Sequence, residues 1–557
     1  MNRVEKLEPK LFQVMREGYS LKQFGMDAVA GVIVAIIALP LSIALALASG
    51  VNPENGIYTA IVAGFLISFF GGSRVQIAGP TAAFATIVAG IVAKDGIEGL
   101  MMASIIAGVL LIIMGILRVG SLIKFIPFTI TTGFTAGIAV TIVIGQLKDF
   151  FGITYAEGVK PIETVDKIKA FGEFFGTFNT QALVVGIVCL VVLFVWPLFN
   201  QRIPSSLIAV VVGIAIVKLG HLNVNTIGDL YTISNSLPAF RMPEFSLELI
   251  GHEFTDGFTI AILAAIESLL SCVVADSMIN SNHNSNQELI AQGIGNIGSV
   301  LFGGIPATGA IARTAANIKN GGKTPVAGMV HSVVLVLVLV LLMPYAALIP
   351  MPTIAAILFQ VAYNMSGWRT FVEIIQRAPK SDIIILIATF VLTIIFDLVV
   401  AIEFGMIAAC FLFMKRMSEE AVIRGWVDFE DLDENDSDRT ELKKVPKHIS
   451  VYEISGPMFF GAVDMLNEIT AKSFTEVIII RMRSVPAIDV TAIRSLEMLI
   501  KRAKKKEIAI IFSHVNEQPM HALEKSGIVD MVGRENFLPH IDEAIDRAIE
   551  LKKQIEM

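Results

Sequence analysis

The sequence predicts an α-helical membrane protein with many spans, followed by a small α/β domain. Of the 557 residues, 54% are hydrophobic and 17% are charged, and the mean hydropathy is +0.71. A soluble protein of this length would carry more charge. Charged residues are also unevenly placed: about one residue in ten is charged between 27 and 414, against about one in three from 415 onward. This pattern excludes a disordered, collagen-like or coiled-coil chain, and the net charge of −7 gives no sign of nucleic-acid binding.

The first 26 residues are expected to form a short polar segment on the cytoplasmic side. They begin with charged residues rather than with the apolar core of a signal peptide, so we predict no cleaved export signal. Cys189, Cys272 and Cys410 lie within apolar runs and lack the spacing of a metal site or a disulfide framework, which favours buried thiols. The sequence also lacks a nucleophile–base set and a metal-ligand spacing. We therefore predict no enzyme activity, no metal and no cofactor.

Apolar runs that cross about 30 Å of hydrocarbon need about 20 residues each. We identify them near 27–48, 54–71, 98–118, 126–147, 180–199, 203–220, 255–279, 287–303, 325–343, 349–363, 381–396 and 398–414. Two shorter segments, 79–93 and 308–319, each follow a stretch that Gly and Pro interrupt, and we interpret them as broken spans. The prediction is therefore fourteen spans over residues 27–416.

The positions of lysine and arginine support this count. With the basic N-terminal segment in the cytoplasm, fourteen spans place most basic loop residues on the inner side. These are Arg74, Arg118, Lys124, Arg202, Lys319, Lys323, Arg369, Arg377, Lys380, Lys415 and Arg416. The loop at 148–180, with its four lysines on the outer side, is an exception. Both termini are then expected to face the cytoplasm.

The two broken segments fall third and tenth among the spans. Each half of the chain, about 27–220 and about 255–416, then has its break in the third helix. Because each half holds an odd number of helices, the two repeats would be inverted. Interrupted segments at matching positions of inverted repeats are typical of the binding site of secondary transporters.

The broken segments also carry the chemistry expected of an anion site. In QIAGPTAAF at 76–84, an extended chain meets a helix start, with Pro80 suited to the first turn. Free N–H groups and the positive end of the helix dipole would face an anion-sized gap, and Thr81 would add a hydroxyl. The alternative is an ordinary proline kink.

The second motif, GGIPATGAIART at 303–314, repeats this arrangement in the other half. Two such helix starts would combine their positive dipole ends, and Arg313 adds a cation one turn into the helix. A charge inside a span is costly and is usually kept for a partner. The alternative for Arg313 is a position near the inner interface, with its side chain reaching the lipid headgroups.

Glu267 lies near the middle of an apolar run. No charged residue occurs between Asp256 and Asp276 apart from Glu267. A carboxylate there is costly unless it is protonated, bound to an ion or paired. Two interpretations stay open at this point: a site that couples transport to a proton or cation, or a structural partner of Arg313.

The hydrophobic pattern changes in the C-terminal tail. Residues 417–446 are interpreted as an acidic linker and residues 447–557 as a domain. Strands are expected at 449–454, 477–482 and 508–512, and helices near 461–470, 490–505, 517–525 and 540–553, which together predict an α/β domain. Asp489 and Thr491 can cap the helix that follows them. The hydroxyl of Thr491 is also a good position for a regulatory phosphate, and a simple cap is the alternative.

Together these motifs resemble the sulfate permease (SulP, solute carrier 26) family of anion transporters. The residues that carry the resemblance are PLSIALA from Pro40, GVNPENGIY at 50–58, GPT at 79–81, NQELIAQGIGN at 286–296 and GGIPATGAIART at 303–314. The segment IDVTA at 488–492 resembles part of a STAS domain. The resemblance covers nearly the whole chain.

The resemblance implies a fold of seven-plus-seven inverted repeats, in which a core domain moves against a gate domain, and a homodimer. It implies that the anion lies between the starts of helices three and ten, at Thr81, Ala82, Gly309, Ala310 and Ile311, with Arg313 nearby. It also implies that Glu267 and Ser271 lie where sodium-coupled bicarbonate members of the family bind sodium. Those members tend to have Asp there, so Glu267 favours proton coupling or exchange. In STAS relatives that act in sigma-factor control, a serine at the position of Thr491 is phosphorylated.

The expected function is secondary active transport of a small anion across the bacterial inner membrane by alternating access. The anion would be sulfate, bicarbonate or a dicarboxylate, because helix dipoles bind all three and the sequence does not separate them. The expected partners are this anion, H⁺ or Na⁺ as the coupling ion, membrane lipids and a second copy of the chain, but no nucleic acid. A sodium-coupled bicarbonate symporter is the alternative within transport. A membrane-anchored signalling scaffold that acts through its tail is the alternative from another class.

Overall fold

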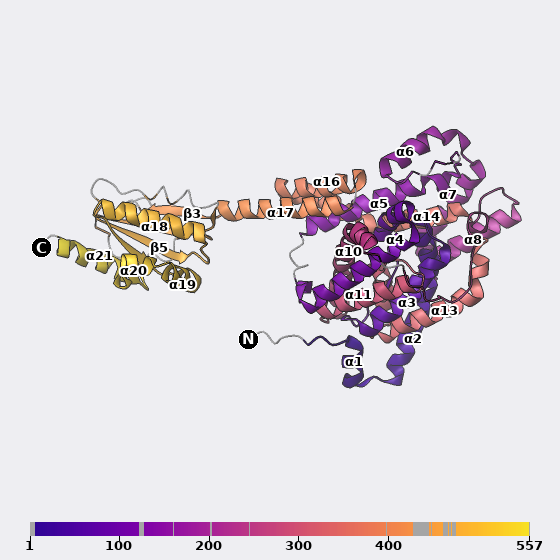
Figure 1. The fold of residues 1–557 in the computed structure, drawn as a ribbon, viewed down its shortest axis with the longest axis horizontal. Coiled ribbons are helices and arrows are strands. Elements are labelled where there is room, and N and C mark those ends of the chain that lie inside the picture. Colours follow the sequence, from indigo (N-terminus) through magenta and orange to yellow (C-terminus); the bar gives the residue numbers. More distant parts are fainter. Residues whose placement is uncertain are drawn as a thin grey trace. The chain divides into compact units, whose positions relative to one another are not determined.

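The fold is that of a computed structural model in which two compact units follow one another along the chain (Figure 1). The structure describes residues 6–121, 127–156, 158–159, 161–200, 203–243, 246–396, 398–426, 445–446, 448–460, 466, 469 and 475–555. The first unit comprises Met1–Met406 and the second Ile407–Met557.

Long apolar helices make up the first unit. Six of the described helices are long and apolar enough to cross a membrane: α2 (Leu21–Ala48), α4 (Ala82–Ile116), α5 (Phe128–Phe151), α7 (Thr180–Phe199), α10 (Leu247–Ile279) and α13 (Val326–Ala346). The other helices that overlap expected spans are α3 (Pro53–Phe70), α8 (Ser205–Leu219), α11 (Ser285–Leu301), α12 (Ile311–Lys319), α14 (Met351–Ser366), α16 (Lys380–Ile395) and α17 (Leu398–Glu419). The predicted helical membrane fold is confirmed, and the exact number of fourteen spans stays a prediction.

Local sequence explains a break inside α4. The two expected spans 79–93 and 98–118 lie in α4 as two helical stretches on either side of Gly96, whose backbone is not helical and has φ at +71°. This left-handed backbone conformation favours glycine. Four short helices lie outside the expected spans: α1 (Lys10–Gly18) in the N-terminal segment, and α6 (Thr164–Glu173), α9 (Ile227–Leu230) and α15 (Trp368–Arg377) in segments between spans.

The helices of the first unit form two packing groups. In one group, α4 packs against α10 and α11, α11 packs against α3, and α13 packs against α2 and α3. In the other, α5 packs against α14 and α16, while α7 packs against α8 and α14. Each group therefore combines helices from both halves of the chain, and the inverted repeats stay a prediction.

Two short extended segments meet inside the first packing group. Strand β1 (Ala78–Gly79) pairs antiparallel with β2 (Thr308–Gly309). The N–H of Ala310 extends the ladder by donating to the carbonyl of Ile77 at 2.9 Å. Because α4 and α12 begin directly after these strands, the pairing brings the two helix starts together.

The second unit contains one five-stranded sheet with helices on both faces (Figure 1). Its strands are β3 (Val422–Trp426), β4 (Ile449–Ser455), β5 (Val477–Ser484), β6 (Ala509–Ser513) and β7 (Phe537–Leu538), in that spatial order. Strand β3 is antiparallel to β4, and the other neighbours are parallel. Helices α18 (Val490–Lys505), α19 (Glu517–Lys525) and α20 (Ile528–Val532) pack on one face and α21 (Ile541–Ile555) on the other.

The central strand β5 shows why this domain folds as an α/β layer. Ile478 and Ile480 belong to the core under α18, whereas Val477 and Ile479 belong to the core under α21. A strand that is buried on both faces reads as a continuous apolar run, which is what the sequence shows here.

The three expected strands of the tail and the expected helices at 490–505, 517–525 and 540–553 are present. Strand β3 was not predicted and lies inside the range 417–446 that the sequence analysis interpreted as a linker. Most of that linker, 427–444, and most of the expected helix 461–470 lie outside the described residues.

Candidate functional site

The two helix starts that the sequence predicted to meet lie side by side, and no side chain caps either of them. Thr81 is the N-cap of α4 and Ala310 is the N-cap of α12, and neither makes a side-chain hydrogen bond to the first turn. Pro80 lies before the N-cap rather than in the first turn, so that expectation was wrong. The orphan N–H groups and the positive dipole ends of both helices are therefore left for a ligand.

The helix starts differ in how open they are. Ala82 and Gly309 are buried, whereas Thr81 and Ala310 are half-buried. Ile311, in the first turn of α12, keeps 45% of its surface exposed. The start of α12 therefore presents an accessible face, which a substrate site needs.

Arg313 is buried in the same region with little compensation for its charge. Its side chain is 3% exposed, and Nη2 donates to the carbonyl of Pro80 at 2.9 Å. Nη1 has no hydrogen-bond partner. Among the described residues, no carboxylate lies within ion-pair distance of Arg313. Its burial excludes the alternative in which the side chain reaches the lipid headgroups.

Glu267 is joined to the start of α4. Its Oε2 accepts a hydrogen bond from the Thr81 hydroxyl at 2.9 Å, and its side chain is half-buried. Glu267 and Arg313 are both described, and the structure contains no ion pair between them. A direct structural pairing with Arg313, one of the two interpretations left open, is thus absent. The hydrogen bond instead connects the acidic side chain to a predicted anion-binding residue.

Helix α10 also holds β2 in place. The hydroxyl of Ser268 accepts from the N–H of Gly309 at 3.1 Å and lies 2.9 Å from the hydroxyl of Thr308. One turn further, the hydroxyl of Ser271 lies 3.5 Å from that of Thr314, which in turn accepts from the N–H of Ile77. In this conformation Ser271 joins α10 to α12. Its predicted role in binding a coupling ion stays a prediction.

A buried polar network, which was not predicted, lies behind the two strands. The carboxylate of Glu288 is fully buried and accepts from the backbone N–H groups of Gly72 and Ser73 and from the side chains of Gln76 and Gln292. These bonds fix the extended segment that leads into β1. The available signal was a carboxylate accompanied by glutamine and asparagine side chains in an expected span, because such residues are rare within a membrane unless they have partners.

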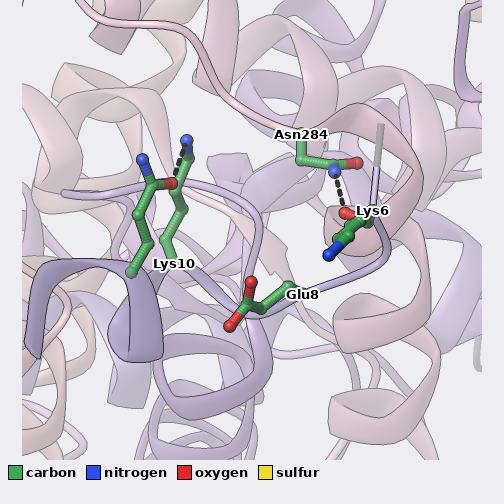
Figure 2. Close-up of a pocket in the computed structure, with 5 residues that line it drawn as sticks. Lys6, Glu8, Lys10 and Asn284 are labelled. Atoms are coloured by element: carbon green, nitrogen blue, oxygen red, sulfur yellow. Dashed lines mark hydrogen bonds between the residues drawn. The ribbon is translucent and has the colours of Figure 1, made fainter. Parts of the chain in front are cut away.

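A separate cavity of about 220 Å³ lies where the N-terminal segment meets the start of α11 (Figure 2). Lys6, Glu8, Lys10 and Asn284 line it together with Gln13. The Asn284 side chain donates to the carbonyl of Lys6 at 3.0 Å, so the N-terminal segment is tied to α11. This cavity includes none of the predicted site residues.

In the tail, the structure separates the roles of Asp489 and Thr491. Asp489 is the N-cap of α18, and its Oδ1 accepts from the N–H of Ala492 at 2.8 Å. Its second oxygen accepts from the N–H of Phe460 at 2.9 Å. Thr491 is exposed in the first turn. The cap is therefore Asp489, and a regulatory role for Thr491 stays a prediction.

We expect Asp489→Ala to destabilise the tail, because it removes the N-cap of α18 and a bond to the preceding loop. An N-cap contributes about 0.5–2 kcal/mol. Thr491→Ala, the matched control, is expected to change the free energy of unfolding by no more than about 0.5 kcal/mol. Urea unfolding of residues 417–557, produced as a separate fragment, measures both. A larger loss for Thr491→Ala than for Asp489→Ala would contradict the assignment of the cap.

Comparison with known proteins identifies both units. Residues 24–389 match the model of the sulfate permease family, and residues 441–544 match that of the STAS domain. The chain is 39% identical to the putative sulfate transporter YvdB of Bacillus subtilis, over 95% of this chain and 98% of the relative. It is 30% identical to the bicarbonate transporter BicA of Synechocystis sp., over 94% of each.

Solved structures support the same fold. The transmembrane domain of a cyanobacterial bicarbonate transporter BicA superimposes with a TM-score of 0.61 at 29% identity, covering 70% of this chain and 98% of that domain. The murine solute carrier 26 family member A9 anion transporter, in its inward-facing state, gives a TM-score of 0.84 at 18% identity. That match covers 99% of this chain and 96% of the other, and it shows a shared fold.

Proposed function

The chain belongs to the sulfate permease family, and from that premise we propose that it is a secondary active transporter of a small anion in the bacterial inner membrane. It is a multi-pass membrane protein with a STAS domain. Its relatives bear the names of sulfate and bicarbonate transporters. We therefore propose a substrate of the sulfate, bicarbonate or dicarboxylate class.

One observation supports this proposal most directly. Two uncapped helix starts and the buried, incompletely paired cation Arg313 lie together around the strand pair. A buried positive charge without a partner is costly. An anion bound at the helix starts would offset that charge and would satisfy the free N–H groups. The proposed anion ligands are Thr81, Ala82, Gly309, Ala310 and Ile311. Arg313 would add to the positive electrostatic potential that attracts the anion.

We propose that Glu267 couples this site to protons. When its carboxylate is ionised, it places a negative charge one hydrogen bond from Thr81 and opposes the arrival of an anion. Protonation removes that charge, so the proton and the anion would favour each other's binding, as linkage requires. Proton-coupled symport follows if both ions move together, and anion exchange follows if the proton stays bound.

A sodium-coupled bicarbonate symporter is the second candidate. It is favoured by the 30% identity to the bicarbonate transporter BicA and by the likeness to the transmembrane domain of a BicA protein. In this case Glu267 and Ser271 would be cation ligands. In the present conformation the Ser271 hydroxyl donates to that of Thr314, so its oxygen lone pairs could still bind a cation.

Uptake of radiolabelled sulfate, bicarbonate and dicarboxylates into proteoliposomes tests the proposed function. We expect accumulation of at least one of these anions, both with the tail and without it. A protein that binds and transports none of the three, yet still requires its tail for a cellular effect, would favour the signalling scaffold instead.

The proposed topology places both termini in the cytoplasm. The structure supports it, because a cavity of about 750 Å³ is lined jointly by Lys10, Arg74, Lys323 and the segment 278–282. These residues come from the N-terminal segment and from three of the loops predicted to be internal. Their meeting at one end of the unit is what the fourteen-span arrangement requires. We also propose transport by alternating access and a homodimeric assembly, on the ground of membership in the sulfate permease family.

We expect single cysteines at Asn223 and Glu543 to react from opposite sides of the membrane. Both side chains are exposed, and an outer loop holds Asn223 in the proposed topology. The measurement is labelling by an impermeant maleimide in intact cells and in inside-out vesicles, after replacement of the native cysteines. Labelling of both positions from the same side would contradict the fourteen-span arrangement.

A further inference from the structure

Three potential metal ligands from two helices meet at a distance from the anion site. Asp95 precedes the kink of α4, while His252 and Glu253 lie near the start of α10. One ligand atom from each of the three lies within 4.8 Å of the others. We propose that Asp95, His252 and Glu253 bind one divalent metal ion of the Zn²⁺ type.

The burial of Glu253 is the observation that points to a ligand. This residue is fully buried, and its Oε2 has no hydrogen-bond partner. Its Oε1 lies 3.2 Å from Nδ1 of His252. A buried carboxylate with an unsatisfied oxygen is costly unless a cation or a donor compensates it. A divalent cation between the three side chains would supply that compensation.

The spacing of the ligand atoms fits a tetrahedral ion. With metal–ligand bonds of about 2.0–2.1 Å, two ligands of a tetrahedral Zn²⁺ lie about 3.3 Å apart. Nδ1 of His252 lies 3.2 Å from Oε1 of Glu253 and 3.8 Å from Oδ1 of Asp95. One imidazole nitrogen with two carboxylates is a zinc-type donor set, whereas Ca²⁺ prefers six to eight oxygens.

The neighbouring residues allow an ion to bind at the three ligands. Gly99 has no side chain, and a Cβ at this position would come within 3.0 Å of Oε1 of Glu253. Lys94 is the cation next to Asp95, with Nζ 3.4 Å from Oδ2, and its side chain is 60% exposed. An exposed lysine can turn toward water when a divalent ion takes the carboxylate, because exposed ion pairs contribute little.

The bound ion would join two helices that carry the anion site. Helix α4 begins beside Thr81, and α10 carries Glu267. A metal between Asp95 and the pair 252–253 would hold these helices together at the ends that the topology places outside. This inference goes beyond the proposed function and does not depend on which anion is carried.

The test is titration of the purified full-length protein with Zn²⁺ after treatment with a chelator. We expect one Zn²⁺ to bind per chain by calorimetry and to raise the midpoint of thermal unfolding. His252→Gln should weaken this binding at least about tenfold, because it removes a direct ligand and even the loss of a group that only orients a ligand typically costs that much. His221→Asn is the control: it removes an exposed histidine outside the cluster, and asparagine tolerates the left-handed backbone there (φ +49°).

Equal Zn²⁺ binding by the wild type and His252→Gln would overturn the proposal, and so would a wild type that binds no Zn²⁺ or prefers Ca²⁺. If His252→Gln does not fold, Asp95→Asn takes its place, and X-ray absorption at the zinc edge of the wild type decides between ligand sets. A shell of nitrogen and oxygen supports the site, whereas a shell with sulfur assigns the ion to cysteines and overturns it. Sulfate and bicarbonate binding by each variant, measured without metal, keeps this result separate from the anion site.

Discussion

Arg313→Glu is expected to weaken anion binding about a thousandfold. Reversing a buried charge changes its interaction with the anion by two units of charge. At about 8 Å and an effective dielectric constant of about 20, each unit is worth about 2 kcal/mol, so the total is about 4 kcal/mol. The measurement is the dissociation constant of the transported anion for purified protein, obtained by calorimetry. Thr81→Val, which removes a single hydroxyl, should cost only about 0.5–1.5 kcal/mol.

The control for this substitution is Lys319→Glu. It makes the same change of charge on the same helix, at an exposed position in the last turn of α12. We expect it to change affinity much less, because solvent screens an exposed charge. Size-exclusion profiles and thermal unfolding establish that each variant is folded, with Arg313→Gln as a milder replacement. Wild-type affinity in a folded Arg313→Glu protein would place the anion site elsewhere.

Glu267→Gln is expected to abolish accumulation of the anion driven by an inward proton gradient. Glutamine imitates the protonated side chain: it is neutral and can still accept the hydrogen bond from Thr81. The variant should therefore bind the anion but should be unable to release a proton. The transport that remains should be exchange of one anion for another, without dependence on pH. Uptake into proteoliposomes with an imposed pH gradient measures the loss.

Glu248→Gln is the matched control for coupling. It neutralises an exposed carboxylate in the first turn of the same helix, α10, and should leave proton-driven uptake unchanged. Full proton-driven accumulation by the Glu267→Gln protein would rule out Glu267 as the coupling group. Wild-type uptake that follows a sodium gradient and ignores pH would instead support sodium coupling, with Glu267 and Ser271 as ligands of the cation.

Several features of the site could be read from particular residues. Glycine and proline at 303–306 interrupt an apolar run, and the structure has the extended segment β2 just after them, followed by α12. The same holds for 76–80 and α4. Such breaks can be predicted from the sequence, because glycine and proline disfavour a helix through their own backbones. The position of Glu267 within an apolar run can be read from the sequence in the same way.

Local sequence patterns did not predict which residues these side chains contact. Sequence reasoning left open whether Glu267 pairs with Arg313, and the structure gives it Thr81 instead, 186 positions away. It also missed Ser268, which fixes the N–H of Gly309. A serine in a helix has no spacing signal of its own. Its role depends on which segment packs against that face of α10.

The sequence by itself determined the membrane class, the change to an α/β tail, the helix starts and the unusual charges within apolar runs. Hydropathy, periodicity and backbone preference depend on neighbouring residues only, so they can be recognised from the sequence without knowledge of the fold. Only the tertiary structure decided that β1 pairs with β2 and that Asp95, beside the kink of α4, lies against the start of α10. These pairings join segments more than 150 positions apart. They depend on how whole helices pack. Apolar faces of similar composition can pack against many different helices, whereas a buried polar group is stable only where the neighbouring segment supplies its hydrogen-bond partners.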